Sequence, residues 1–276
     1  MKKAYVIGKN ASKSLSPTIF HYWFKKYNIE GEYEFKEISE SDFNNIIPSI
    51  LKEKDLCGLN ITIPFKEKII EHLHSIDKYA KKIGAVNCIS KTKEGFVGTN
   101  TDWIGFEESI KWQEKNNTSK ITSKEKAVLI GYGGASKAIL YSLLKTGFKK
   151  IRVFNRDFSK IKNLKNITAH KLDEIENYFG EANLVINTAP INYNKDLNLT
   201  TFKTNFVEEK TAHSPHGFDA CYNQNTFFLD HFNKRKRFYG LHMLIHQAAP
   251  CFHKWYGVMP EADTKLVTLL EKLLDQ

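Results

Sequence analysis

The sequence contains no long hydrophobic run and no paired cysteines, and these two absences narrow the class of protein. No stretch approaches the roughly 18 apolar residues of a membrane-spanning helix. The four cysteines in 276 residues lie far apart and form no C-x-x-C pair, which argues against a zinc or redox site and favours reduced thiols. The apolar stretch in residues 1–8 is only four residues long, so it predicts a first strand and not a secretion signal. We therefore expect a cytoplasmic protein without membrane association.

The chain is basic, and its charge bears on possible partners. Its 41 Lys and Arg residues exceed its 31 Asp and Glu residues and give a formal net charge of +10. Many lysines fall where solvated helix faces or turns are expected, as at Lys25, Lys81 and Lys149, and no basic block is interleaved with aromatic residues that could stack on bases. We expect no nucleic-acid partner. The charge fits a general attraction for anionic small molecules equally well.

The first hundred residues alternate strand-like runs with helical patterns, which is typical of an α/β domain. A serine cap and Pro17 open a helix whose apolar residues recur at helical spacing from Ile19 to Tyr27. In one predicted strand Leu59, Ile61 and Ile63 point one way and Asn60 and Thr62 the other. The predicted strands are Lys3–Ile7, Tyr33–Ile38, Gly58–Ile63 and Ala85–Ser90.

A polar loop at residues 116–120 precedes a second α/β segment. A strand over residues 127–130 leads into the glycine turn at 131–136, a helix to about Thr146 and a further strand at 151–154, with a later strand at 184–186. This βαβ order is typical of the start of a dinucleotide-binding domain. The tail from Glu261 predicts a helix that packs back on one of the domains, with an apolar stripe formed by Leu266, Leu269, Leu270, Leu273 and Leu274.

The glycine turn can hold a pyrophosphate. Gly131, Gly133 and Gly134 stand directly after a strand and before a helix, where close backbone approach and free N–H groups favour phosphate. The strict fingerprint has Gly or Ala at its sixth position, which here is Ser136. Taken alone, the turn also fits a methyltransferase or a plain tight turn.

The end of the next strand bears on the choice of dinucleotide. NAD-binding folds usually place an acid there, whereas this strand ends in Asn155 and Arg156, with Lys160 one turn further. An arginine at this point can pair with the 2′-phosphate of NADP, although a solvated arginine is the plain alternative. Arg156 therefore favours NADP. The neighbouring Asp157 would weaken phosphate binding, and for this reason NAD is not excluded.

Four segments of the N-terminal half carry polar residues that core packing does not require. Each has an ordinary explanation by itself, as a helix cap, a solvated sheet face or a turn. Together, their S-x-S-P, N-x-T-x-P-x-K, G-A-V-N and N-T-D-x-x-G motifs resemble the shikimate dehydrogenase family. The segments are residues 14–17, 60–66, 84–87 and 98–105. The resemblance continues with G-x-G-G-A-S at 131–136, N-R at 155–156, D-x-x-Y at 219–222 and G-x-x-M-L-x-x-Q-A at 240–248.

The resemblance implies a fold and an activity. The expected fold is an N-terminal α/β substrate-binding domain (residues 1–102), a Rossmann-like NADP-binding domain (103–239) and C-terminal helices that pack back on the first domain (240–276). The implied activity is the reversible reduction of 3-dehydroshikimate to shikimate by NADPH, in the biosynthesis of chorismate and the aromatic amino acids. The implied assembly is a monomer or a homodimer.

The resemblance also assigns roles to residues. Lys66 and Asp102 are the implied catalytic pair, because ketone reduction places negative charge on oxygen and needs a proton donor and a cation nearby. The implied substrate-binding residues are Ser14, Ser16, Asn60, Thr62, Asn87, Tyr222 and Gln247. The implied cofactor-binding residues are Gly131, Gly133, Gly134, Ala135, Asn155, Arg156, Lys160 and Gly240.

The sequence departs from the family pattern at four places on the cofactor side. These are residues 190–193, Gln224, His242 and Asp157. They leave open an NAD-preferring quinate/shikimate dehydrogenase, and a cofactor-binding paralogue that no longer catalyses is an alternative of another class.

Overall fold

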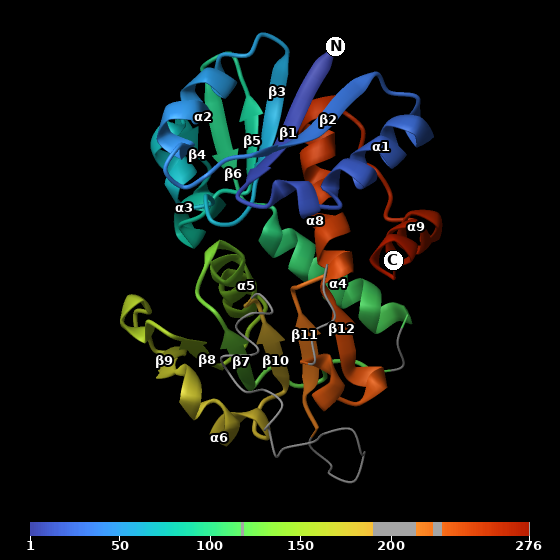
Figure 1. Cartoon of the computed structure of the whole chain (residues 1–276). Coiled ribbons are helices and arrows are strands. Elements are labelled where there is room, and N and C mark those ends of the chain that lie inside the picture. The colour runs from blue at the N-terminus through green and yellow to red at the C-terminus, as the bar shows by residue number, and fades with distance from the viewer. Residues whose placement is uncertain (117–118, 190–213, 223–227, 276) are drawn as a thin grey trace. The chain divides into compact units, whose positions relative to one another are not determined.

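The computed structural model of the chain describes residues 1–116, 119–189, 214–222 and 228–275 (Figure 1). It divides into two compact units, one of Met1–Gly105 with Leu244–Gln276 and one of Phe106–Met243. The chain leaves the first unit inside helix α4 (Asp102–Asn116) and returns inside helix α8 (Gly240–Tyr256). Among the described residues, the helices are all too short or too polar to cross a membrane.

The first unit is built on a six-stranded sheet of mixed direction. The spatial order of its strands is β2-β1-β3-β5-β6-β4. Strand β1 is parallel to both of its neighbours, so the polar segments that follow β1 and β3 start at the same edge of the sheet. Strand β5 is antiparallel to β3 and to β6. The bounds are β1 Lys2–Gly8, β2 Gly31–Glu37, β3 Leu56–Ile61, β4 Ser75–Ile76, β5 Cys88–Lys91 and β6 Phe96–Thr99.

Aromatic packing joins the predicted N-terminal helix to the sheet of the first unit. Helix α1 (Ser16–Tyr27) forms where its cap and apolar spacing predict it. Its Phe20 stacks on Tyr33 of β2 with ring centroids 3.8 Å apart and lies 5.7 Å from the ring of Trp255 in α8. The remaining helices of this unit are α2 Phe43–Leu51, α3 Lys78–Ile83 and α9 Thr264–Leu274.

Two details of the predicted first unit are wrong. Strand β3 ends at Ile61, and Ile63 is 59% exposed, because the chain turns after Ile61 and Phe65 takes the buried position. In the C-terminal helix Leu266 and Leu270 are buried as expected, but Leu269 and Leu273 are more than a third exposed. The leucine stripe is therefore wider than the buried face of the helix, which consists of Leu266, Val267 and Leu270.

The second unit has the sheet order of a dinucleotide-binding fold. The order of its described strands is β12-β11-β10-β7-β8-β9, and all of the neighbouring pairs are parallel. If strands β7 to β12 are numbered 1 to 6 and the sheet is read from β9, the order is 3-2-1-4-5-6. This is the Rossmann arrangement that the resemblance implies. The bounds are β7 Lys126–Ile130, β8 Lys150–Asn155, β9 Ile167–Lys171, β10 Leu184–Asn187, β11 His216–Asp219 and β12 Arg237–Tyr239.

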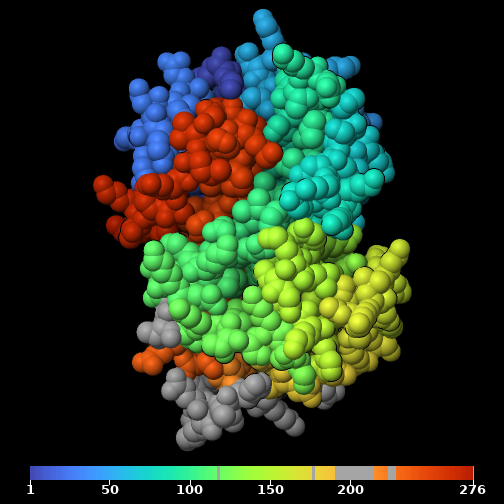
Figure 2. Space-filling model, turned by 180° about the vertical axis from the view of Figure 1, so that it is seen from behind, coloured from blue at the N-terminus to red at the C-terminus, as the bar shows by residue number. Residues whose placement is uncertain are grey.

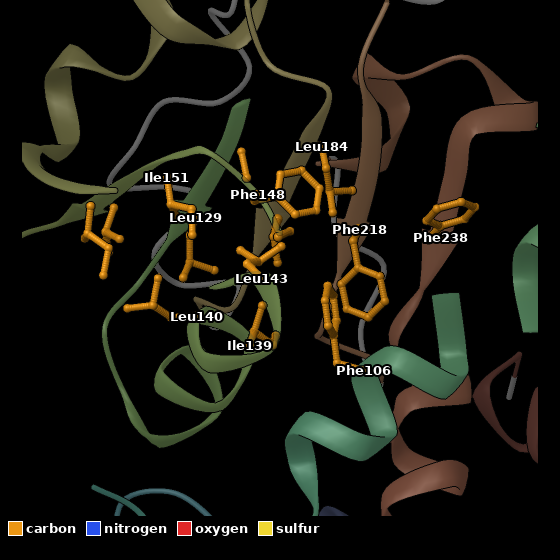
Figure 3. Close-up of a cluster of buried hydrophobic side chains, with 14 of the residues drawn as sticks. Phe106, Leu129, Ile139, Leu140, Leu143, Phe148, Ile151, Leu184, Phe218 and Phe238 are labelled. Carbon is orange, nitrogen blue, oxygen red and sulfur yellow. The ribbon is translucent and has the colours of Figure 1, made fainter. Parts of the chain in front are cut away.

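The core of the second unit fixes the helix that follows the glycine turn. Helix α5 (Gly134–Lys145) buries Ile139 and Leu143 against Leu129 of β7 and Ile151 of β8 (Figure 3). The parallel strands are hydrophobic along their length because helices cover both faces of such a sheet. The packing holds the N-terminus of α5 at the carboxyl end of β7. A short helix, α6 (Glu176–Phe179), lies later in this unit.

Candidate active site

Lys66 and Asp102 form an ion pair in the first unit. The Lys66 Nζ lies 2.6 Å from Asp102 Oδ2, and the two side chains are only 12% and 6% exposed. Phe65, buried and stacked on Phe43 with centroids 4.1 Å apart, anchors the segment that carries Lys66. The Lys66 carbonyl also accepts a hydrogen bond from the Val86 amide at 2.7 Å. The backbone that carries the Lys66 side chain is therefore fixed by the core and by its hydrogen bond to Val86.

Asp102 is the first residue of helix α4 and is positioned by the asparagine that precedes it. The Asn100 Oδ1 accepts a hydrogen bond from the backbone amide of Asp102 at 3.0 Å, and the Asn100 Nδ2 donates to the Ala85 carbonyl at 2.9 Å. A carboxylate at the start of a helix is favoured by the partial positive charge of the free N–H groups there. The N-T-D segment, for which an isolated turn was the plain alternative, thus starts a helix of 15 residues.

Asn87 holds the second oxygen of the Asp102 carboxylate. Its Nδ2 lies 2.8 Å from Asp102 Oδ1, 2.9 Å from Thr101 Oγ1 and 3.1 Å from Gln247 Oε1. Its Oδ1 accepts from the Thr101 amide at 2.6 Å. The Asp102 carboxylate is therefore fixed at both oxygens, by Lys66 on one side and by Asn87 on the other. This network brings together three predicted site residues of the N-terminal half with Gln247 of α8.

Asn60 lies behind this network and is already satisfied by the protein. Its Nδ2 donates to the Asn87 carbonyl at 3.1 Å and to Cys251 Sγ at 3.2 Å, and its Oδ1 accepts from the Tyr33 hydroxyl at 2.7 Å. The side-chain amide has two donors, and both are used. Asn60 therefore positions Asn87, and only the remaining lone pair of its oxygen is left for a ligand.

Ser14, Ser16 and Thr62 follow the strands that end at one edge of the sheet. Ser14 Oγ accepts from the Ser16 amide at 3.2 Å and lies 3.1 Å from Ser16 Oγ, at the N-terminus of the 12-residue helix α1. Hydroxyls and free N–H groups at a helix start favour an anion. Thr62 follows β3 and packs beside Gly8 at the end of β1. Tyr222, in contrast, belongs to the second unit, after β11.

The glycine turn of the second unit leaves an open surface at the N-terminus of α5. Gly131 has φ +99°, and a Cβ there would lie 2.5 Å from Thr188 Oγ1. At Gly133 a Cβ would meet no atom within 4 Å, so the surface of the turn is open where α5 begins at Gly134. Ser136 donates to the Gly131 carbonyl at 2.6 Å and is buried. The departure from the fingerprint at Ser136 therefore closes the turn instead of disrupting it.

The end of β8 carries a basic pair around Asp157. Arg156 is exposed, and Lys160 Nζ lies 3.1 Å from Asp157 Oδ2. The hydrogen bond from the Ser159 hydroxyl, followed by the one from Lys160, holds the pKa of Asp157 below its usual range. Lys160 thus offsets the negative charge that would oppose a phosphate beside Arg156. Both side chains are exposed, so water screens their attraction and Lys160 stays accessible to a ligand phosphate.

Gly240 is a packing requirement at the start of α8. A Cβ there would lie 2.6 Å from the carbonyl oxygens of Asp219 and Ala220, so no larger residue fits. Asp219 is itself buried and accepts from Asn187 Nδ2 at 3.1 Å and from the Cys221 amide at 3.0 Å. These contacts fix the carboxyl ends of β10 and β11. Of the departures from the family pattern, residues 190–193 and Gln224 lie outside the described residues.

Sequence reasoning missed three residues that hold the site. Thr101 bonds Asn87 by backbone and side chain, Tyr33 bonds Asn60, and Cys251 accepts from Asn60. Thr101 stands inside the N-T-D motif, which is a signal that was available. Tyr33 and Cys251 carry no local signal, because an aromatic in a strand and a lone thiol in a helix both resemble ordinary core residues.

Comparison with known proteins assigns both halves of the chain to one family. Residues 6–89 match the shikimate dehydrogenase substrate binding domain, and residues 114–194 match shikimate / quinate 5-dehydrogenase. The shikimate dehydrogenase (NADP(+)) of Pelagibacter ubique is 32% identical over 98% of this chain and 100% of its own length. That of Bartonella quintana is 30% identical over 96% and 92%. The crystal structure of shikimate dehydrogenase 1 from Peptoclostridium difficile superposes with a TM-score of 0.80 at 27% identity, over 99% of this chain and 98% of that one.

Proposed function

The chain belongs to the shikimate dehydrogenase family, and we propose that it catalyses the reversible reduction of 3-dehydroshikimate to shikimate by NADPH. This reaction is a step in the biosynthesis of chorismate and the aromatic amino acids. The observation that carries the proposal is the Lys66–Asp102 pair, since its carboxylate is fixed at both oxygens while its ammonium has donors to spare.

Lys66 is the proton donor in the proposed reduction. One of its three N–H groups is used on Asp102 Oδ2, and two remain for the carbonyl oxygen of the substrate. NADPH, when bound, supplies the hydride that converts the carbonyl carbon into a secondary alcohol carbon. As negative charge grows on the oxygen, the Lys66 ammonium stabilises it and transfers a proton to it. In the reverse direction the neutral amine accepts the hydroxyl proton.

Asp102 keeps the Lys66 ammonium in position and binds the reacting hydroxyl of the substrate. Its two oxygens are held by Lys66 and Asn87, so the carboxylate has little freedom to turn away. Preorganisation of this kind lowers the barrier because the groups need not reorient during the reaction. The intact and mutually bonded pair also argues against a paralogue that has lost catalysis.

The substrate carries one carboxylate and several hydroxyls, and the chain offers a partner for each kind of group. Ser14 and Ser16 at the start of α1 suit the carboxylate. We assign the hydroxyls to Asn87, Thr62 and Gln247, together with Tyr222 of the second unit. Asn60 supports Asn87 from behind.

NADP(H) fits the second unit. The backbone of Gly131, Gly133, Gly134 and Ala135 would hold the diphosphate at the N-terminus of α5, where the open face at Gly133 leaves room for it. Asn155, Arg156 and Lys160 at the end of β8 would take the adenosine 2′-phosphate. Gly240, which packs against the carbonyls of Asp219 and Ala220, stays a proposed cofactor-binding residue at the start of α8.

The proposed reaction is tested by following the nicotinamide absorbance band with purified protein. We expect shikimate-dependent reduction of NADP⁺, with kcat/KM for NADP⁺ exceeding that for NAD⁺. The alternative, an NAD-preferring quinate/shikimate dehydrogenase, rests on Asp157. It would be favoured by faster turnover of quinate with NAD⁺. The absence of turnover with shikimate and with quinate, each tested with NADP⁺ and with NAD⁺, would refute the proposal.

The domain roles, the location and the partners complete the proposal. We assign substrate binding to residues 1–102 with 240–276 and cofactor binding to residues 103–239. Cys88 and Cys251 are buried free cysteines, and we propose a cytoplasmic location, where thiols stay reduced. A monomer or homodimer without nucleic acid is expected, and sedimentation analysis with and without added DNA tests both points.

A further inference from the structure

A pocket of the first unit lies away from the catalytic pair. It has a volume of about 400 Å³, within the range of small-molecule sites. Its lining comes from the start of β1, the start of β3, the end of β5 and the last turn of α8. The lining residues are Met1, Lys2, Lys54, Asp55, Leu56, Cys57, Lys91, Lys254 and Trp255.

This pocket is at the edge of the sheet opposite the catalytic residues. It contains the first residues of β1 and β3, whereas Ser14 and Lys66 follow the carboxyl ends of the same two parallel strands. A six-residue strand such as β3 is about 20 Å long. The pocket is therefore no extension of the proposed shikimate site. In Figure 1 the N label marks this edge, and Figure 2 shows the dark blue N-terminal residues next to the red C-terminal part of the chain.

The charge in this pocket is strongly one-sided. Four of its nine lining residues are lysines, and Asp55 is the one acid among them. Within the described part of the chain, none of these four ammonium groups forms an ion pair with a carboxylate. Elsewhere on the first unit, lysines such as Lys3, Lys26 and Lys36 each pair with a glutamate or an aspartate.

Two of the four ammonium groups are fixed by backbone carbonyls instead. Lys2 Nζ donates to the Trp255 carbonyl at 2.7 Å, and Lys91 Nζ donates to the Lys54 carbonyl at 3.3 Å. Each of these ammonium groups keeps further N–H donors for a ligand. Carbonyls orient a cation without cancelling its charge, so the positive potential of the pocket persists.

We propose that this pocket binds a small anion that carries two or more phosphate groups. Lysine is a compact point charge that binds phosphate oxygens well, and a ligand with two phosphates can engage ammonium groups on both sides of the pocket. The pocket is large enough for such a group with a modest organic substituent. The proposal is independent of the catalytic function.

The test is a backbone-amide NMR titration of the ¹⁵N-labelled full-length protein with sodium pyrophosphate, with sodium chloride as the ionic-strength control. We expect saturable shifts at the amides of Leu56, Cys57 and Lys91. Inorganic phosphate should bind at the same amides at least about tenfold more weakly, because it engages fewer lysines at once. Raising the salt should weaken both.

A pair of double variants separates the pocket from the general basic charge of the protein. Lys54→Gln with Lys254→Gln removes two pocket ammonium groups that, among the described residues, form neither a side-chain hydrogen bond nor an ion pair, and it should raise the pyrophosphate Kd at these amides at least about tenfold. Lys25→Gln with Lys81→Gln removes the same charge from exposed positions of the same unit and should leave the Kd within about twofold.

Three results would overturn the proposal. The first is the absence of saturable shifts at the pocket amides. The second is an equal weakening in both double variants, which would mean a general attraction between a basic protein and an anion. The third is shifts confined to residues 131–135, which would place pyrophosphate at the glycine turn alone.

Discussion

Replacing Tyr33 by Phe removes one hydroxyl from behind the active site and leaves the packing intact. The ring stays stacked on Phe20, but Asn60 Oδ1, in a residue that is only 5% exposed, loses its donor at 2.7 Å. Burial raises the pKa of Tyr33 well above its ordinary value, so the hydroxyl is a protonated donor at every working pH. A buried acceptor left without a partner costs about 1–3 kcal/mol.

The loss should appear both in stability and in turnover. Asn60 donates a hydrogen bond to the Asn87 carbonyl, and Asn87 holds Asp102 Oδ1. We expect the free energy of unfolding to fall by about 1–3 kcal/mol. We also expect kcat/KM for shikimate to fall roughly tenfold, which corresponds to about 1.4 kcal/mol, while KM for NADP⁺ stays unchanged because these contacts all lie in the first unit.

Tyr5→Phe is the matched control on the same sheet. The Tyr5 hydroxyl donates to Glu53 Oε2 at 2.8 Å, but Glu53 is a third exposed and also pairs with Lys36. This variant should lose less than about 1 kcal/mol, since the acceptor keeps water and a cation, and its kcat should be that of the wild type. Steady-state rates and denaturant unfolding measure both variants. Wild-type kcat/KM in Tyr33→Phe would refute the argument that this hydroxyl positions the site.

Three further predictions concern the second unit. Arg156→Ala should weaken NADPH at least about tenfold more than NADH, and equal losses in cofactor titrations would make Arg156 structural. Gly131→Ala should destabilise the unit by about 1–3 kcal/mol and weaken NADP⁺ binding, because the φ of Gly131 is +99° and Thr188 leaves no space for a Cβ. Gly133→Ala should weaken NADP⁺ binding with unchanged stability, because a Cβ there meets no atom of the protein. Unchanged stability in Gly131→Ala would contradict this argument. Burial, followed by the charge of Lys236, lowers the pKa of His216 to about 4. The folded state therefore favours the neutral imidazole, and stability that is complete above pH ~6.5 should decline as the pH falls towards about 4. His216→Gln should show a shallower pH dependence of unfolding than the wild type over that window, and identical slopes would exclude His216 as the cause.

The local parts of the structure could be predicted from the sequence, since their signals are local. Helix α1 follows from a serine, a proline and a 3.6-residue apolar period, and the glycine turn follows from residues between one strand and one helix. Lys66 and Asp102 stand 36 positions apart. Their pairing could be anticipated only because both lie in motifs that the family resemblance connects.

The parts that could not be predicted depend on contacts distant in sequence. The bond from Asn60 to Cys251 joins residues 191 positions apart, and nothing near either residue indicates it. Alternation of polar and apolar residues cannot show where a strand stops, which is why the strand was expected to run to Ile63 although it ends at Ile61. A leucine stripe likewise shows which face of a helix is apolar but not how much of it is covered, as Leu269 and Leu273 demonstrate.

The central claim is that the Lys66 ammonium exchanges the proton with the substrate oxygen. The most direct measurement is kcat for shikimate oxidation by Lys66→Ala, beside Lys36→Ala, which breaks a comparable ion pair to Glu53 at 2.8 Å on the same unit. We predict a fall in kcat of at least roughly 10²-fold for Lys66→Ala with a folded protein and a normal NADP⁺ affinity, and no change for Lys36→Ala. A kcat within a few-fold of the wild type in Lys66→Ala would contradict the account.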